Sequence, residues 1–158
     1  MRPLLVFPAI LLMTSLAMVG CKSPEGPGSD SLAAVEISGR SFVEVARTTS
    51  EVFQEAGFQP APLPPNQDRE KRLVFEKRGT AGDGWLYGDW SSSEIWYRAK
   101  VVFATHGADT YLIKCDAFRV LEKGSKHFEE EHKLSRAKRG AYQDLLNKVK
   151  AKLQGAKA

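Results

Sequence analysis

The sequence predicts an α+β domain built as a two-layer sandwich, with two helices packed on one face of an antiparallel meander sheet of three to five strands. Two helical stripes, one early and one at the C-terminus, flank the central part of the chain. Between them, two long segments alternate between apolar and polar residues around a short connection that contains glycine. Such alternation gives each strand a dry and a wet face, so we expect both helices on the dry side.

The N-terminal helix is expected directly after Ser41. Ser41 and Glu44 fit a capping box, in which each side chain accepts a hydrogen bond from the backbone N–H of the other residue, and Gly57 is a typical C-terminal stop. Apolar side chains then recur at the spacing of one helix face. This stripe consists of Phe42, Val45, Ala46, Thr49, Val52, Phe53 and Ala56.

The strands are expected after a proline-rich connector at residues 59–70. Residues 72–78 alternate weakly, whereas 95–105 and 110–121 alternate well, and residues 106–109 form the hairpin connection. One face should carry Ile95, Tyr97, Ala99, Val101 and Phe103 together with Tyr111, Ile113, Cys115 and Ala117. The other face should carry Trp96, Arg98 and Lys100 together with Leu112, Lys114, Asp116 and Phe118.

Two further segments are candidate strands at the margins of the sheet. Residues Trp85–Asp89 suit a short strand, and residues His127–Leu134 suit either an edge strand or the start of the last helix. The last helix is predicted from a second apolar stripe, and Gly155 ends it. That stripe consists of Tyr142, Leu145, Leu146, Val149 and Leu153.

The N-terminal residues have the organisation of an export signal. Arg2 provides a short positive region, and residues 4–16 are almost wholly apolar. A membrane-spanning helix needs roughly 20 apolar residues, and this run is too short before the chain turns polar at Lys22. Pro3 and Pro8 also disfavour a permanent helix in lipid. We therefore interpret this segment as a cleaved signal peptide.

The end of the signal, Met18-Val19-Gly20-Cys21, resembles the lipobox of bacterial lipoproteins, with Met18 where that family usually has leucine. The resemblance implies that Cys21 receives a diacylglycerol and that cleavage falls between Gly20 and Cys21. Acyl chains such as palmitate would then hold the protein in the bilayer. Lys22 replaces the aspartate that favours inner-membrane retention in enteric bacteria, which implies the outer membrane, facing the periplasm. An ordinary secretory signal with an incidental cysteine is the alternative.

These observations divide the chain of 158 residues into four parts. We expect a signal peptide over residues 1–20, a lipidated cysteine and flexible tether over 21–34, one globular domain over 35–154, and a tail over 155–158. The formal net charge is +4, and basic residues concentrate near the C-terminus. A solvated helix face is the simplest interpretation of these cations, with contact to anionic lipid or glycan as an alternative.

No catalytic or metal-binding motif is recognisable. His106 stands apart in a turn, and His127 and His132 are five residues apart, so the zinc spacing H-E-x-x-H is absent. The acidic run Glu129–Glu131 is interpreted as a solvated surface, because acid–base chemistry needs carboxylates in two different environments. We therefore expect no catalytic residue, no metal and no cofactor, and hence a protein that is not an enzyme.

An aromatic group is the most suggestive binding feature. The possible binding surface consists of Trp85, Tyr87, Trp90 and Trp96, whose rings could stack on sugars or on a partner protein. Core packing is the alternative for part of the group. Because Trp96 and the adjacent Tyr97 must point to opposite faces of a strand, at least one ring should lie off the core.

Because Cys21 would carry the lipid, Cys115 has no partner for a disulfide within the chain. We therefore interpret Cys115 as a small buried side chain in a strand.

The favoured hypothesis is a membrane-anchored, non-catalytic envelope protein that binds or supports another envelope component. Its expected partners are the lipid bilayer, through acylated Cys21, and an envelope protein or cell-wall glycan, with no nucleic acid. The alternative is a module that binds peptidoglycan, another glycan or a small ligand through the aromatic surface. A hydrolase is the least favoured hypothesis.

Overall fold

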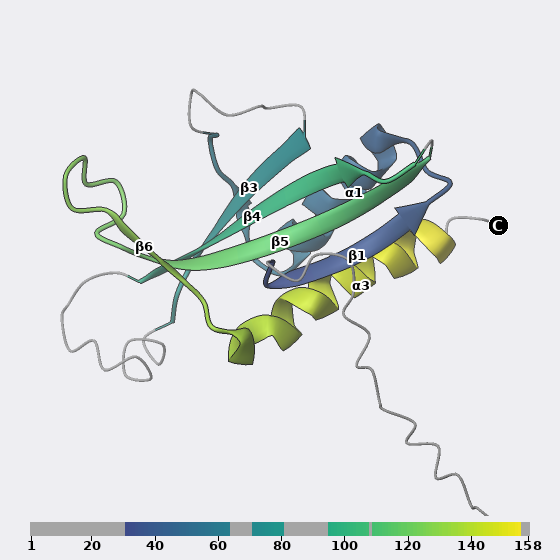
Figure 1. The fold of residues 1–158 in the computed structure, drawn as a ribbon. Helices are drawn as coiled ribbons and strands as arrows, with labels where there is room; N and C mark the ends of the chain where they lie inside the picture. Colours follow the sequence, from purple (N-terminus) through teal and green to yellow (C-terminus); the bar gives the residue numbers. More distant parts are fainter. Residues whose placement is uncertain (1–30, 64–70, 81–94, 108, 156–158) are drawn as a thin grey trace, which may run out of the picture.

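The computed structural model describes residues 31–63, 71–80, 95–107 and 109–155. The elements in chain order are β1 (Ala33–Ser38), α1 (Phe42–Glu55), β2 (Gln59–Pro60), β3 (Arg72–Arg78), β4 (Trp96–Thr105), β5 (Thr110–Leu121), β6 (Glu130–Lys133), the 3-10 helix η2 (Arg136–Lys138) and α3 (Arg139–Gly155) (Figure 1). Two helices pack on one face of an antiparallel sheet, which confirms the predicted α+β sandwich.

The sheet has the strand order β1-β5-β4-β3-β2, and β6 also pairs with β5. β1 pairs with residues 110–115 of β5, while β6 pairs with residues 118–121. Because β4 occupies the other edge of β5 along this length, β1 and β6 lie end to end on the same edge. The described strands number six, more than the three to five expected, and β1 interrupts the simple meander.

The predicted N-terminal helix is confirmed in detail. Ser41 is the N-cap, and its side chain and that of Glu44 form the reciprocal capping box. Phe53 and Val52 are fully buried from the predicted stripe. Gly57 follows the helix with φ of +85°, a conformation that favours glycine because it has no Cβ.

The C-terminal helix α3 packs along β1, and the two elements start at the same end of the domain (Figure 1). Tyr142, Leu146, Val149 and Leu153 are buried, which confirms the predicted stripe. The amide of Gln143 also bonds the backbone of Ala34: it accepts from the Ala34 N–H at 3.3 Å and donates to the Ala34 carbonyl at 2.9 Å.

The core lies between the helices and the sheet. Phe53 of α1 stacks on Phe75 of β3 with ring centroids 4.7 Å apart. Cys115 is fully buried in β5, as predicted, and is a free cysteine. Burial raises the pKa of its thiol far above the usual value, because the charged thiolate cannot be hydrated there, and the neighbouring Asp116 carboxylate adds to this.

The sheet begins earlier than the sequence indicated. Ala33 and Ala34, which the sequence predicts to lie in the tether, are the first residues of β1, and Leu32 just before them is only 4% exposed. Within the ambiguous segment at residues 127–134, Glu130–Lys133 form strand β6, and the segment does not extend the last helix.

The predicted signal peptide, the lipobox with Gly20 and Cys21, and the candidate strand Trp85–Asp89 lie outside the described residues. Among the helices that are described, none is long and apolar enough to cross a membrane.

Candidate functional site

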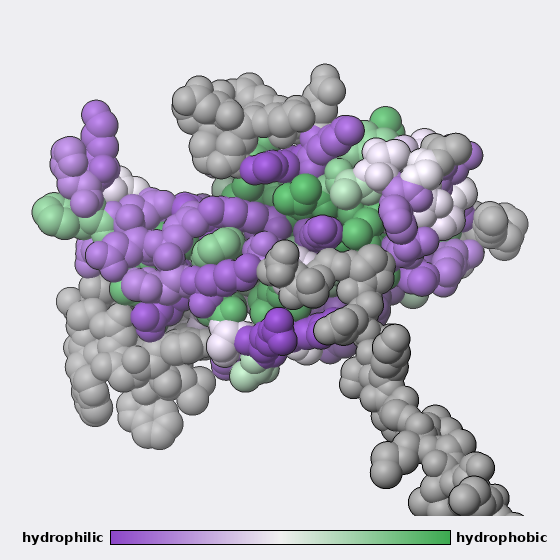
Figure 2. Space-filling model, in the orientation of Figure 1, coloured by the Kyte–Doolittle hydropathy of each residue, from purple (hydrophilic) through white to green (hydrophobic). Residues whose placement is uncertain are grey.

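The sheet has two unlike faces. In the middle of β4 and β5, odd-numbered residues such as Val101 and Ile113 are fully buried in the core beneath the helices. Even-numbered residues of the same strands form the opposite side, which we call the open face. Figure 2 shows it as a largely hydrophilic surface over β5 and β6, with hydrophobic residues between the polar ones near the middle of the sheet.

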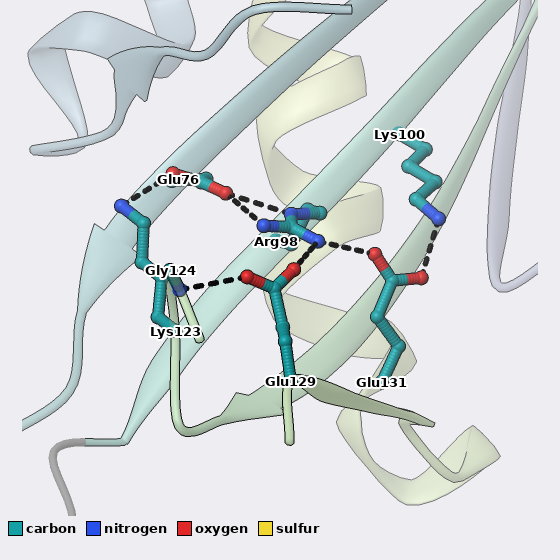
Figure 3. Close-up of polar contacts among 7 residues, drawn as sticks. All are labelled: Glu76, Arg98, Lys100, Lys123, Gly124, Glu129 and Glu131. Atoms are coloured by element: carbon teal, nitrogen blue, oxygen red, sulfur yellow. Dashed lines mark hydrogen bonds and ion pairs between the residues drawn. The ribbon is translucent and has the colours of Figure 1, made fainter. Parts of the chain in front are cut away.

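Arg98 lies at the centre of a charged cluster on the open face. The sheet register places it opposite Glu76 of β3 and Phe118 of β5. Its Nε donates to Glu76 at 2.7 Å, and one terminal nitrogen lies 2.7 Å from Glu129 and 2.5 Å from Glu131 (Figure 3). One guanidinium therefore binds carboxylates from segments that are far apart in the sequence.

Two lysines complete the cluster. Lys100 contacts Glu131 at 2.5 Å, and Lys123 contacts Glu76 at 2.5 Å. Glu76 is only 7% exposed, and a carboxylate buried to this degree needs paired cations, since an unpaired buried charge costs several kcal/mol. The three cations and three carboxylates balance, so the cluster has no net charge. We call these residues the ion network: Glu76, Arg98, Lys100, Lys123, Glu129 and Glu131.

The connection between β5 and β6 positions the two glutamates. Glu122 and Gly124 both have positive φ, which turns the chain back, and the Gly124 N–H donates to Glu129 at 2.8 Å. Strand alternation then directs Glu129 and Glu131 to the open face, with side chains 28% and 27% exposed. The run Glu129–Glu131 is exposed, as predicted, but two of its residues, Glu129 and Glu131, also form ion pairs with the sheet, which the sequence did not indicate. Only Glu130 points away, with its side chain 67% exposed.

The network favours the charged forms of Glu129, Glu131 and Arg98. The Gly124 N–H, followed by Arg98, lowers the pKa of Glu129 below its ordinary value. For Glu131, burial raises the pKa, but hydrogen bonds from Lys100 and Arg98 outweigh it and the net direction is downward. Burial likewise opposes the charge of Arg98, and its bonds to the three carboxylates keep its pKa above the usual value. The arrangement is suited to clamping β6 onto the sheet, because every carboxylate in it is already paired.

Beside the ion network, the open face has a shallow depression of about 370 Å³. Its lining combines apolar and cationic side chains, and its one acid, Asp116, accepts from the Leu32 N–H and pairs with Lys133. Lys114 has no acidic partner among the described residues. The side chains that define this depression are Val74, Val102, Phe118, Arg72, Lys100 and Lys114.

Of the predicted aromatic surface, only Trp96 falls within the described residues; Trp85, Tyr87 and Trp90 lie outside them. Trp96 is the first residue of β4, is half-buried and belongs to the open face, while Tyr97 faces the core side. The Lys123 ammonium lies 3.5 Å from the centroid of the Trp96 ring, a cation–π contact. This contact occupies one face of the ring.

The three histidines lie in separate environments. His106 lies 3.6 Å from Glu36, His132 lies 3.1 Å from Glu130, and His127 is exposed in the β5–β6 connection. Within the described ranges, no group of three or more histidine, cysteine or acidic side chains could hold a metal ion.

Sequence reasoning missed the ion network, although a signal for it was present. Arg98 was predicted on the polar face of its strand, but its partners depend on the pairing of three strands. The alternation of Glu129 and Glu131 about Glu130 indicated a two-sided strand, in which two acids share one face. Recognising residues 130–133 as a strand would have predicted that pair.

Comparison with known proteins assigns no family. No protein-family model and no curated protein matches the chain. Among solved structures, the chain is similar to the adenylate sensor from AMP-activated protein kinase in complex with the ribofuranotide ZMP. The identity is 8% over 74% of this chain and 94% of that chain, with a TM-score of 0.47. A likeness at this level bears on neither ligand nor activity.

Proposed function

We propose that this protein is a lipid-anchored, non-catalytic component of the bacterial cell envelope, held in the outer membrane and facing the periplasm. The observation that carries the proposal is the lipobox-like Met18-Val19-Gly20-Cys21 after an apolar export signal. The folded domain supports it, because β1 begins at Ala33, close behind Cys21. At most about 40 Å of extended chain therefore separates a lipid on Cys21 from the sheet.

The anchor is tested by metabolic labelling with a fatty acid in the native host. Label should enter the wild-type protein and be absent from Cys21→Ala, because only the thiol can accept the diacylglycerol. Label persisting in Cys21→Ala would refute lipidation at this residue. Secretion of both proteins without label would support the ordinary secretory signal instead.

We further propose that the domain binds another envelope component through the open face. Supporting this, the depression beside the ion network pairs apolar walls with cations, the combination that ligand and partner sites use. Lys114 is the cation best placed to meet an incoming anionic group, since it has no acidic partner among the described residues.

Photocrosslinking in intact cells tests this surface. A photoreactive residue in place of Lys114 should give discrete crosslinked species, whereas one in place of Glu51, on the outer side of α1, should not. Equal crosslinking from both positions would contradict a specific open-face partner.

Glycan binding is a second candidate, favoured by the place of Trp96 on the open face. Retention of the protein on purified cell wall should fall in Trp96→Ala and in Trp90→Ala if their rings stack on sugars. Unchanged retention in both variants would exclude this alternative. The matched control is Tyr97→Phe, which leaves the open face intact.

A further inference from the structure

The segment between β6 and α3 gathers exposed cations at one end of the domain. Lys133 ends β6, Arg136 and Lys138 lie in η2, and Arg139 begins α3, all four exposed. No acidic residue occurs between Lys133 and Gln143. Lys133 pairs with Asp116, but Arg136 and Arg139 have no acidic partner among the described residues. We call Lys133, Arg136, Lys138 and Arg139 the basic patch.

Helix stability does not explain the basic patch. Three of its cations stand in η2 and at the start of α3, and the first turn of α3 has no acidic residue. The N-terminus of a helix carries a partial positive charge, so cations there are electrostatically unfavourable. Ser135 makes no side-chain capping bond that would offset this. The cations therefore sit where local electrostatics disfavours them.

The basic patch lies beside the point where the chain enters the domain from its N-terminus. The Leu32 N–H bonds Asp116, and the Leu134 N–H bonds the carbonyl of the next residue, Ala117. Gln143, one helical turn after Arg139, bonds Ala34. The start of β1 and the basic patch are thus neighbours on the same stretch of β5, as the shared end of β1 and α3 in Figure 1 shows.

We propose that the basic patch docks on an anionic lipid bilayer and so orients the domain on the membrane that anchors it. This inference rests on the proposed lipidation of Cys21, which would place the bilayer within about 35 Å of Ser31 along ten residues of chain. A cation near an anionic surface is attracted over roughly one Debye length. The four cations of the basic patch lie beside the start of β1, so they would act together on the same membrane surface. The open face would then be held in a fixed relation to the membrane.

Vesicle binding tests the inference without the lipid anchor. The probe is the chain from residue 21 with Cys21→Ser, so that no acyl chain contributes. It should co-sediment with vesicles of phosphatidylethanolamine and phosphatidylglycerol and not with vesicles of phosphatidylcholine, and added salt should release it. Equal binding to both vesicle types, or binding to neither, would overturn the proposal while leaving the Cys21 labelling result untouched.

Matched variants locate the contact. Arg136→Gln/Arg139→Gln should bind anionic vesicles about twenty-five-fold more weakly, the product of roughly five-fold per cation. Arg136→Lys/Arg139→Lys should bind like the parent chain, because it keeps both charges. The control Lys126→Gln/Lys148→Gln removes two exposed cations elsewhere and should change binding less than about two-fold.

Two results would contradict the basic patch as a bilayer-docking site. One is an equal loss in the control, which would mean that only the overall charge matters. The other is a strong preference of the parent chain for purified anionic cell-wall polymer over vesicles, lost in Arg136→Gln/Arg139→Gln, which would assign the basic patch to a glycan. Circular dichroism of each variant should match that of the parent, so that a binding loss reflects the surface and not unfolding.

Discussion

The covered face and the open face of one sheet are stabilised in different ways. On the covered face, apolar side chains such as Phe53 and Ile113 lose all contact with water and pack against the helices. On the open face, the ion network joins β3, β4 and the β5–β6 connection through charges that are only partly desolvated. Each apolar side chain that is buried stabilises the fold. An ion pair stabilises it only where the attraction between the charges exceeds the cost of removing their hydration. The covered face should therefore supply most of the stability, and the open face should fix the position of β6.

Removing a core ring should have the largest effect. Phe53→Ala deletes a fully buried ring that stacks on Phe75, and the expected loss is about 3–5 kcal/mol of unfolding free energy. Urea denaturation measures it, with Val43→Ala, whose side chain is 72% exposed, as a control near zero. A loss below about 1 kcal/mol would contradict the place of Phe53 in the core.

Arg98→Met should rank second and act mainly on the open face. It removes the cation shared by Glu76, Glu129 and Glu131, and the expected loss is about 3 kcal/mol, because Glu76 is buried. Amide hydrogen exchange should accelerate in β6 more than in α1. The control Arg47→Met breaks an exposed pair and should cost less than about 1 kcal/mol. Uniform acceleration across all elements would contradict a local clamp.

Ser41→Ala tests how much the cap of α1 contributes to the stability of the covered face. Loss of the cap of α1 should cost about 1 kcal/mol, because one backbone donor of the first turn loses its partner. Thermal or urea unfolding measures it, and Ser41→Asp should restore most of the loss. A cost as large as that of Phe53→Ala would show that α1 depends on its cap more than on its packing.

The smallest effect should appear in acid. A carboxyl whose folded pKa is lowered stabilises the fold above its unfolded pKa of about 4.3, and this stabilisation is lost as the pH falls through the folded pKa. Glu129 and Glu131 behave in this way. Unfolding free energy measured from pH 6 to pH 3 should therefore fall less steeply in Glu129→Gln than in the wild type. Parallel profiles would contradict the pairing of Glu129.

The sequence predicted the parts of the fold that local patterns specify. The capping box at Ser41, the hairpin before Thr110 and the apolar stripes of both helices each depend on residues close together in the chain. β1 was missed because Ala33 and Ala34 follow a Gly/Pro/Ser-rich stretch and have small side chains. Ala33 is buried and Ala34 is half-buried only because β5 and α3, which lie far along the chain, cover them.

The candidate site was harder to predict for a related reason. Arg98 and Glu76 are separated by the end of β3, its connection to β4 and the start of β4, and only the strand register places them opposite each other. No local period encodes such a register. The sequence shows that basic residues concentrate near the C-terminus. The position of the basic patch beside the start of β1 could not be predicted, because it follows from the pairing of β1 and β6 with the same edge of β5.

The bond between Gln143 and Ala34 bears on self-association. An outer strand offers unpaired N–H and C=O groups to which a second chain can add, and such edges promote aggregation. The Gln143 amide supplies the same donor and acceptor that an added strand would, and it satisfies both groups of Ala34 from within the molecule. The helix that buries its apolar stripe in the core thus also protects β1 with a polar side chain, and the sheet is closed to extension at that residue.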